Sequence, residues 1–152
     1  MTAHLDEHYQ KGYIASDPEL DPKPQIRIVN IKKMIENDKL TDKEVFKRTY
    51  LGHARMSSAF VFQGHKGPFR QHIHVGHDEI GIVLSGAGKV TVGGVTYNVN
   101  VGDLWIIPAN IPHSGEFTEP TNVLFISSPQ DHPVHQDRIW IDELEAAAKP
   151  RR

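Results

Sequence analysis

The chain has 152 residues, a formal net charge of −2, interspersed acidic and basic residues, and no cysteine. This length suits one domain with its own core, and the charge pattern offers no basic patch for a nucleic acid or a membrane surface. The missing cysteines exclude disulfides, thiolate metal ligands and cysteine nucleophiles. The polar N-terminus lacks the apolar segment of a signal peptide, and no apolar run has membrane-spanning length. We therefore expect a cytoplasmic protein without a nucleic-acid or membrane partner.

The first 45 residues are polar and contain three closely spaced prolines, so we expect an N-terminal arm rather than a core element. Within this arm, residues 25–31 alternate apolar and polar side chains and predict a short strand. Residues 32–40 predict a short helix. Thr41 and Glu44 have the spacing of a capping box, but the apolar run after them is too short to predict a helix.

From about residue 45 the chain consists of short β-rich runs, each closed by Gly, Pro or Asn. Such regular runs are typical of an antiparallel sandwich or barrel. Gly93 and Gly94 predict a two-residue hairpin turn, because glycine accepts the positive φ that such turns require. Residues 138–149 predict a strand that leads into a short terminal helix. The remaining predicted strands are residues 45–52, 57–64, 79–86, 88–94, 95–103, 103–109 and 122–129.

One segment carries several potential metal ligands. His72 and His74 are one residue apart, so on a strand both point to the same face. If the turn after His74 closes a hairpin, Glu79 returns beside them, and His113 follows much later behind two prolines. Two imidazoles and a carboxylate suit non-haem Fe(II), and a fourth nitrogen ligand also suits Mn, Ni, Cu or Zn. On spacing alone, a metal site and a decorated turn are equally good interpretations.

The segment from Gly67 to Gly86 resembles the first sequence motif of the cupin superfamily. That motif runs Gly, five residues, His-x-His, three or four residues, Glu, six residues, Gly. Here Gly67 is followed after four residues by His72 and His74, then after four residues by Glu79 and after six by Gly86. The first gap is one residue short, and no ligand position is affected.

The second cupin motif runs Gly, five residues, Pro-x-Gly, two residues, His, three residues, Asn. This chain has Gly102, Pro108, Asn110, His113 and Phe117 at the corresponding positions. Asn110 replaces a glycine and Phe117 replaces an asparagine. Asparagine also tolerates the left-handed conformation that a turn glycine often provides. The resemblance covers about residues 58–127, with all four metal-ligand types in register.

The resemblance implies an all-β cupin fold, a double-stranded β-helix or jelly-roll barrel, with an N-terminal extension and short flanking helices. It divides the chain into an N-terminal arm (1–45), the cupin barrel (46–140), and a C-terminal helix with a basic tail (141–152). It also implies a homodimer, with the arm wrapping the partner subunit. The implied cofactor is a divalent transition metal, with Fe(II) favoured over Mn, Ni, Zn or Cu. The implied ligands are His72, His74, Glu79 and His113.

The residues between the ligands have other predicted places. His77 and Asp78 lie in the turn and are expected to point to solvent, with His77 as a candidate gate of the pocket mouth. Gln71 and Ile73 alternate away from the ligand face. No spacing argument links the other histidines to the site, and we expect them on the surface or in loops: His4, His8, His53, His65, His132 and His135.

Gly81 shares the face of Glu79 in the predicted strand. A glycine within a strand often marks a close approach by a ligand or another backbone, so one hypothesis is that Gly81 leaves space for substrate; a bulge or bend is the alternative. Some cupin lyases carry a catalytic tyrosine at this position, and that mechanism is not supported here. Arg70 suits a substrate carboxylate or phosphate. The other candidates for the pocket wall are Phe60, Phe62, Trp105, Phe117, Phe125, Gln63 and Arg55.

Three functions follow from the resemblance and the metal site. The first is an Fe(II) dioxygenase acting on a small organic substrate that chelates the metal. The second is a non-oxidative metal-dependent lyase, isomerase or decarboxylase. The third is a metal-dependent binding or sensor protein without turnover. The fold does not choose among them.

Overall fold

The computed structural model describes residues 28–54, 57–128 and 138–142. Within these residues, ten strands form two antiparallel five-stranded sheets, and one short helix precedes them. The prediction of an all-β fold with short strands is confirmed. The elements are α2 (Ile31–Asn37), β1 (Phe46–Ala54), β2 (Ser57–Gly64), β3 (Gly67–His74), β4 (Asp78–Ser85), β5 (Ala87–Val92), β6 (Val95–Asn100), β7 (Leu104–Ile107), β8 (His113–Phe117), β9 (Thr121–Ser128) and β10 (Arg138–Trp140).

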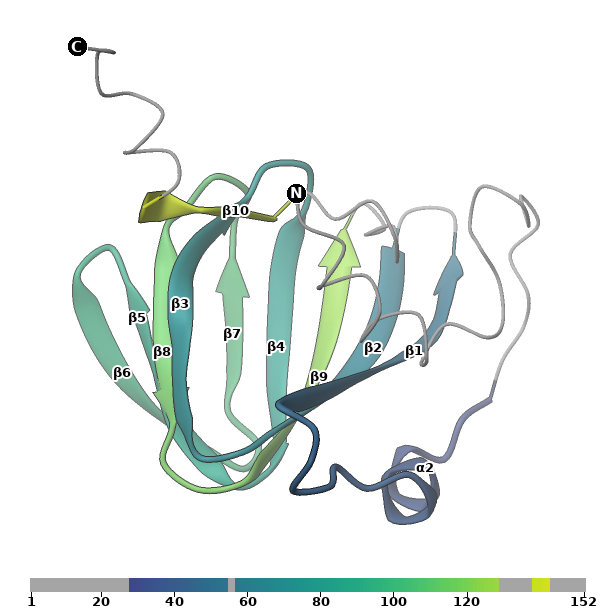
Figure 1. Ribbon diagram of the computed structural model, residues 1–152. Helices are drawn as coiled ribbons and strands as arrows, with labels where there is room; N and C mark the ends of the chain where they lie inside the picture. The colour runs from purple at the N-terminus through teal and green to yellow at the C-terminus, as the bar shows by residue number, and fades with distance from the viewer. Residues whose placement is uncertain (1–27, 55–56, 129–137, 143–152) are drawn as a thin grey trace, which may run out of the picture.

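The two sheets face each other and enclose the interior of the barrel, while α2 lies outside them (Figure 1). One sheet has the order β1-β2-β9-β4-β7, and the other has the order β10-β3-β8-β5-β6. Period-two alternation sends one set of side chains inward from each sheet. From the first sheet these include Phe60, Val83 and Val123, and from the second Val90 and Phe117, all of which are buried.

The hairpin predicted at Gly93 and Gly94 is confirmed. Both glycines have positive φ, 58° and 79°, and the flanking residues Val92 and Val95 pair directly between β5 and β6. Positive φ at both central residues is the requirement of a type I′ turn, which matches the twist of the strands.

One prediction for the N-terminal part, the short strand at residues 25–31, is wrong in its described residues. Residues 28–30, the described part of the strand predicted at 25–31, are not in a strand, and Ile31 begins α2. The reason is local: the Asn30 side chain accepts a hydrogen bond from Lys33 N at 3.0 Å and caps the helix. The predicted short helix is confirmed as α2.

The Thr41–Glu44 motif forms its contacts without a helix. Glu44 Oε2 accepts from both the backbone N and the hydroxyl of Thr41, each at 2.8 Å, and β1 begins at Phe46. The motif therefore stabilises a turn that leads into a strand.

The turn after His74 is not a hairpin. β3 pairs with β8 and β10, whereas β4 pairs with β7 and β9, so residues 75–77 carry the chain from one sheet to the other. The sequence reasoning therefore gave the wrong connection. It still placed Glu79 near the histidines correctly, because the two sheets face each other.

β10 confirms the predicted strand near residue 138, and residues 141–142 are helical; the rest of the predicted terminal helix lies outside the described residues. Most of the arm, including His4 and His8, also lies outside them, as do Arg55, His132 and His135. Among the described residues, no helix is long and apolar enough to span a membrane.

Candidate metal centre

Four potential ligands from both sheets meet at one point inside the barrel. His72 and His74 come from β3, His113 from the neighbouring strand β8, and Glu79 from β4 in the opposite sheet. One ligand atom from each residue lies within 4.8 Å of the other three. His72 and His113 are direct cross-strand partners, and this pairing places both imidazoles on the inner face.

Backbone carbonyls fix which nitrogen of two imidazoles carries the proton. His72 Nδ1 lies 2.8 Å from the carbonyl oxygen of Arg70, and His113 Nδ1 lies 2.9 Å from that of Ile111. A carbonyl only accepts, so each Nδ1 is the donor and each Nε2 keeps its lone pair. This arrangement presents Nε2 as a metal ligand.

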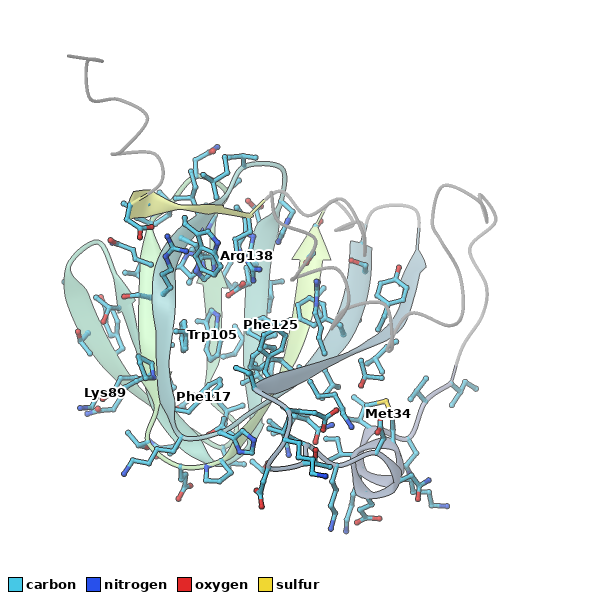
Figure 2. The ribbon with its side chains drawn as sticks, in the orientation of Figure 1. Met34, Lys89, Trp105, Phe117, Phe125 and Arg138 are labelled. Atoms are coloured by element: carbon cyan, nitrogen blue, oxygen red, sulfur yellow. The ribbon has the colours of Figure 1, made fainter. Side chains whose placement is uncertain are left out.

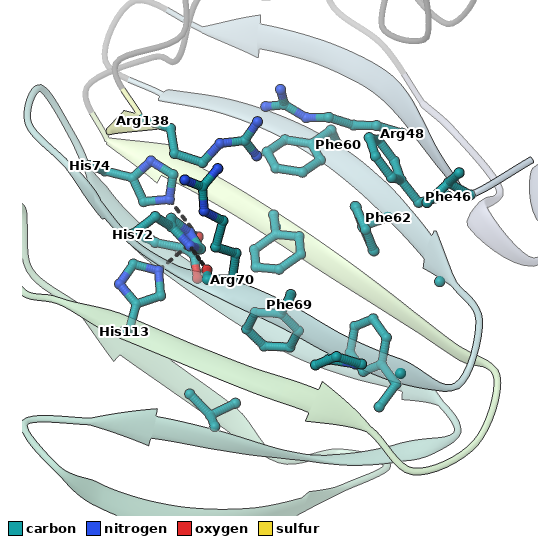
Figure 3. Close-up of a pocket in the computed structure, with 18 of the residues that line it drawn as sticks. Phe46, Arg48, Phe60, Phe62, Phe69, Arg70, His72, His74, His113 and Arg138 are labelled. Atoms are coloured by element: carbon teal, nitrogen blue, oxygen red, sulfur yellow. Dashed lines mark hydrogen bonds and ion pairs between the residues drawn. The ribbon is translucent and has the colours of Figure 1, made fainter. Parts of the chain in front are cut away.

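The Glu79 carboxylate is held from two sides. Its Oε2 lies 3.1 Å from His74 Nε2 and 3.9 Å from His113 Nε2 (Figure 3). Its Oε1 accepts a hydrogen bond from Trp105 Nε1 at 3.0 Å. The indole therefore orients the carboxylate from the neighbouring strand β7.

Gly81 makes room for that indole. Gly81 and Trp105 are cross-strand partners, and a Cβ added at Gly81 would lie 2.1 Å from the Trp105 ring. The hypothesis that Gly81 leaves space for substrate is therefore wrong, because the tryptophan fills that space. The pairing of β4 with β7 has no register shift at Gly81, so there is no bulge there either. The absence of a side chain at Gly81 lets the Trp105 indole reach the position from which it donates to Glu79.

The loop before His113 is fastened to the corner between β3 and β4. Asn110 N donates to the carbonyl of His74 at 2.7 Å, and Ala109 N donates to Asp78 Oδ1 at 2.8 Å. Asn110 has φ 65°, which is the left-handed backbone conformation. The cupin motif has a glycine at this position, and glycine adopts this conformation readily. These bonds bring β8, and with it His113, to the other ligands.

The pKa values of the cluster favour metal-binding protonation states. Burial, followed by the charges of His113 and His74, lowers the pKa of His72 to about 3. Burial also lowers the pKa of His113. For Glu79, burial raises the pKa, but the hydrogen bond and charge of His74 outweigh this effect, and the net pKa lies below its ordinary value. Near neutral pH the imidazoles of His72 and His113 are thus neutral and Glu79 is a carboxylate.

The donor set fits a divalent transition metal. His113 Nε2 is buried and has no hydrogen-bond partner, and an unsatisfied buried nitrogen is costly. A cation among the four donors would satisfy it. Three imidazoles and one carboxylate suit Fe, Mn, Ni, Cu or Zn rather than Ca or Mg, which prefer oxygen ligands.

The two residues of the turn have different places. Asp78 is exposed and its carboxylate holds Ala109 N. His77, however, is 3 % exposed and its ring centroid lies 4.3 Å from that of His74. The expectation that His77 points to solvent is therefore wrong. It lines the cavity beside the ligands, although it is outside the group of four.

A cavity of about 580 Å³ opens onto the four ligands. Phenylalanine and tryptophan side chains form a large part of its wall, and Trp105, Phe117 and Phe125 lie between the two sheets (Figure 2). The predicted pocket residues that line it are Arg70, Phe60, Phe62, Trp105, Phe117, Phe125 and His77.

Gln63 and Gly81 do not line the cavity. The Gln63 side chain is buried against the N-terminal segment, where Oε1 accepts from Leu40 N at 3.0 Å and Nε2 donates to the Asp38 carbonyl at 2.9 Å. The alternation that puts Phe60 and Phe62 inward puts Gln63 on the other face of β2. Gln63 anchors the residues that follow α2.

Sequence reasoning did not single out several lining residues. These are chiefly Arg48 on β1, Phe69 on β3, and Arg138 and Trp140 on β10. Alternation back from His72 predicts that Phe69 points outward, but the register of β3 against β8 shifts between Phe69 and His72 and brings Phe69 to the inner face. The pairing of β10 with β3 could not be predicted locally, because it joins Arg138 to His74 and Trp140 to His72. His53 and His65 are outside the group of four ligands. His65 nevertheless lines the cavity, and its Nε2 forms hydrogen bonds with the carbonyls of Thr41 and Glu44.

Comparisons with known proteins agree with this arrangement. Residues 60–128 match the family model described as a cupin domain. A search of the curated proteins found no match. Among solved structures, KdgF from Halomonas sp. is 27% identical, with a TM-score of 0.55 over 62% of this chain and 90% of that chain.

Two further solved structures show the likeness of the fold. A Klebsiella pneumoniae protein with a double-stranded β-helix domain is 18% identical, with a TM-score of 0.60 over 76% of this chain and 97% of that chain. A Streptomyces PAC13 variant, solved with uridine, is 17% identical, with a TM-score of 0.56 over 70% and 87% of the two chains. The match of the family model and the two facing antiparallel sheets lead to the same conclusion: residues 60–128 form a cupin domain.

Proposed function

We propose that this protein is a metal-dependent enzyme that converts a small organic substrate, with dioxygenation at an Fe(II) centre as the favoured reaction. The observation that supports the proposal most directly is the cluster of His72, His74, Glu79 and His113 at the wall of a cavity of about 580 Å³. A volume of this order suits a small molecule rather than a macromolecule.

The protein groups have distinct tasks in this proposal. A bound Fe(II) would supply the redox chemistry and open positions for a chelating substrate and O₂. The three imidazoles and Glu79 hold the cation, and Trp105 keeps Glu79 oriented. The aromatic wall excludes water from the reacting groups.

A non-oxidative lyase, isomerase or decarboxylase is the second candidate, and His77 is the observation that favours it. This imidazole is buried in the cavity wall next to the ligands, but it is not in the ligand group. Such a position suits a group that moves a proton to or from a metal-bound substrate. A dioxygenase does not require that group.

Metal loading and oxygen uptake test the proposal. Protein stripped of metal is loaded anaerobically with Fe(II), Mn(II), Ni(II) or Zn(II), and a panel of small chelating acids is added. The proposal predicts oxygen consumption and product only with the Fe(II) form, and loss of both in His113→Ala. Product formation without oxygen uptake would favour the second candidate, and tight binding without product would favour the sensor.

A matched comparison separates the two enzymatic candidates. His77→Gln keeps a polar side chain but cannot act as an acid or base. A dioxygenase should keep most of its turnover in this variant, whereas a proton-transfer enzyme should lose about 10²-fold or more. Lys89→Gln serves as the control, because Lys89 points away from the cavity (Figure 2) and pairs with Glu116.

A further inference from the structure

Three arginines lie on one side of the cavity. Arg48, Arg70 and Arg138 line it from β1, β3 and β10, which belong to both sheets. Figure 3 shows their guanidinium groups gathered near Phe60 and His74, while Phe62 and Phe69 lie on the other side. Three cationic groups from three separate strands therefore converge beside the candidate metal centre.

The register of β10 explains the position of Arg138. Arg138 pairs with His74 and Trp140 pairs with His72, so both side chains share the face of the ligands. The Arg138 guanidinium carbon lies 4.5 Å from the centre of the Trp140 ring, and that of Arg70 lies 4.7 Å from it. Trp140 is thus an aromatic support for two arginines at this end of the cavity.

Arg48 reaches the same region from the opposite sheet. It is only 5 % exposed, and its guanidinium carbon lies 3.6 Å from the centre of the Phe60 ring. The ring fixes the plane of the guanidinium at the cavity wall. A charge held in such a desolvated place interacts more strongly with an incoming anion than it would in water.

Among the described residues that line the cavity, cationic side chains outnumber acidic ones. Among the described lining residues, the cationic side chains are Arg48, Lys66, Arg70 and Arg138, and the only acidic one is Glu79. Glu79 belongs to the candidate metal centre, and the nearby Asp142 pairs with Arg70.

We propose that Arg48 and Arg138, with Arg70 beside them, form an oxyanion-binding subsite, and that the substrate is a small organic acid with an apolar body. The planar guanidinium groups suit a carboxylate or a phosphate, and the phenylalanines opposite them suit an aromatic or aliphatic body. The relevance of this subsite to catalysis rests on the proposed metalloenzyme function, but anion binding itself does not require the metal.

Binding of matched probes to metal-free protein tests the subsite. Benzoate, phenyl phosphate and the uncharged benzamide share one ring and differ in charge. The arginine Nε–H signals of ¹⁵N-labelled protein report binding at the guanidinium groups directly, and calorimetric titration gives the affinity. The proposal predicts that benzoate or phenyl phosphate shifts arginine signals and binds at least tenfold more tightly than benzamide. Which anion binds more tightly identifies carboxylate or phosphate as the recognised group.

Variants identify the residues. Arg138→Gln and Arg48→Gln should each weaken binding of the preferred anion about tenfold and leave benzamide unchanged, while Lys89→Gln should bind as the wild type does. Equal affinity of the anions and benzamide for wild-type protein would overturn the proposal, and so would unchanged anion affinity in Arg138→Gln. Since Arg48 is buried, the direct arginine signals of the wild-type protein decide the matter if Arg48→Gln does not fold.

The outcome is independent of the metalloenzyme proposal. Anion binding that depends on the arginines, together with failure to bind a metal, would refute the function and keep the subsite. Metal binding and turnover, together with anion binding that does not depend on the arginines, would support the function and refute the subsite.

Discussion

At the scale of single residues, the centre depends on side chains that do not themselves contact a metal. Two backbone carbonyls fix the tautomers of His72 and His113, and Trp105 orients Glu79. Gly81 in turn gives the indole its place. Such outer partners typically change metal affinity 10- to 100-fold when they are removed.

The contact between Gly81 and Trp105 predicts a coupled pair of substitutions. Gly81→Ala should push the indole aside, destabilise the fold by about 1–3 kcal/mol and weaken metal binding. In a Trp105→Leu background the same change should cost much less, since the ring is gone. Denaturant unfolding of the four proteins gives the coupling energy. Additive effects would mean that the indole does not occupy the space above Gly81.

The buried imidazoles predict how the stability of the metal-free protein depends on pH. The pKa of His72 falls from 6.5 to about 3 on folding, and that of His113 also falls. Between these values the unfolded chain binds more protons, so acid stabilises the unfolded state. The free energy of unfolding should therefore decrease below about pH 6.5, by up to about 1.4 kcal/mol per pH unit for each such histidine.

Below pH 4.5 Glu79 should add to this loss, because its pKa is also lowered on folding. Denaturant titrations at pH 7.5, 6.5, 5.5 and 4.5 measure the slope. His72→Gln should have a smaller slope than the wild type between pH 6.5 and 5.5. Constant stability across this range would contradict the account.

At the scale of elements, the short β-rich runs predicted the strands and the cupin resemblance predicted the ligand set, but neither predicted how the strands pair. The short runs and the Gly93–Gly94 turn were readable because alternation and turn chemistry are local. The connection between β3 and β4 could not be predicted in this way, since a hairpin and a crossover between sheets need the same turn residues. The indole over Gly81 and the arginine on β10 also arise from pairing between strands distant in the sequence.

The loop before β8 offers a test at this scale. Asn110 has φ 65° and donates to the His74 carbonyl, so the loop needs a residue that accepts left-handed backbone. Asn110→Gly should leave the free energy of unfolding nearly unchanged, while Asn110→Ala should lower it by about 1 kcal/mol. Equal stability of the two variants would show that this backbone conformation is not required.

At the scale of the whole molecule, the homodimer stays a prediction. The outward face of β4 and β7 carries Ile80, Ile82, Leu104 and Ile106, and the last two are 54% and 65% exposed. Apolar side chains gathered on an outer face often mark an interface, and a second copy of this chain is the partner that the superfamily resemblance implies.

Light scattering after size-exclusion chromatography measures the mass of the assembly. The wild type should elute as a dimer and Ile106→Glu as a monomer, because a charge in an apolar interface is costly. Thr96→Glu on the exposed strand β6 is the control. A monomeric wild type would refute the homodimer.

The candidate centre also links the two sheets, because three ligands come from one and Glu79 from the other. A cation bound there stabilises the folded state according to its affinity and concentration, by about 4 kcal/mol at a thousandfold excess over Kd. The most direct test is the metal content and the Tm of protein before and after loading with Fe(II), Mn(II), Ni(II) or Zn(II). The account predicts one metal ion per chain, a raised Tm, and loss of both in His113→Ala and Glu79→Ala. No bound metal in the wild type, or equal metal binding in the two variants, would contradict it.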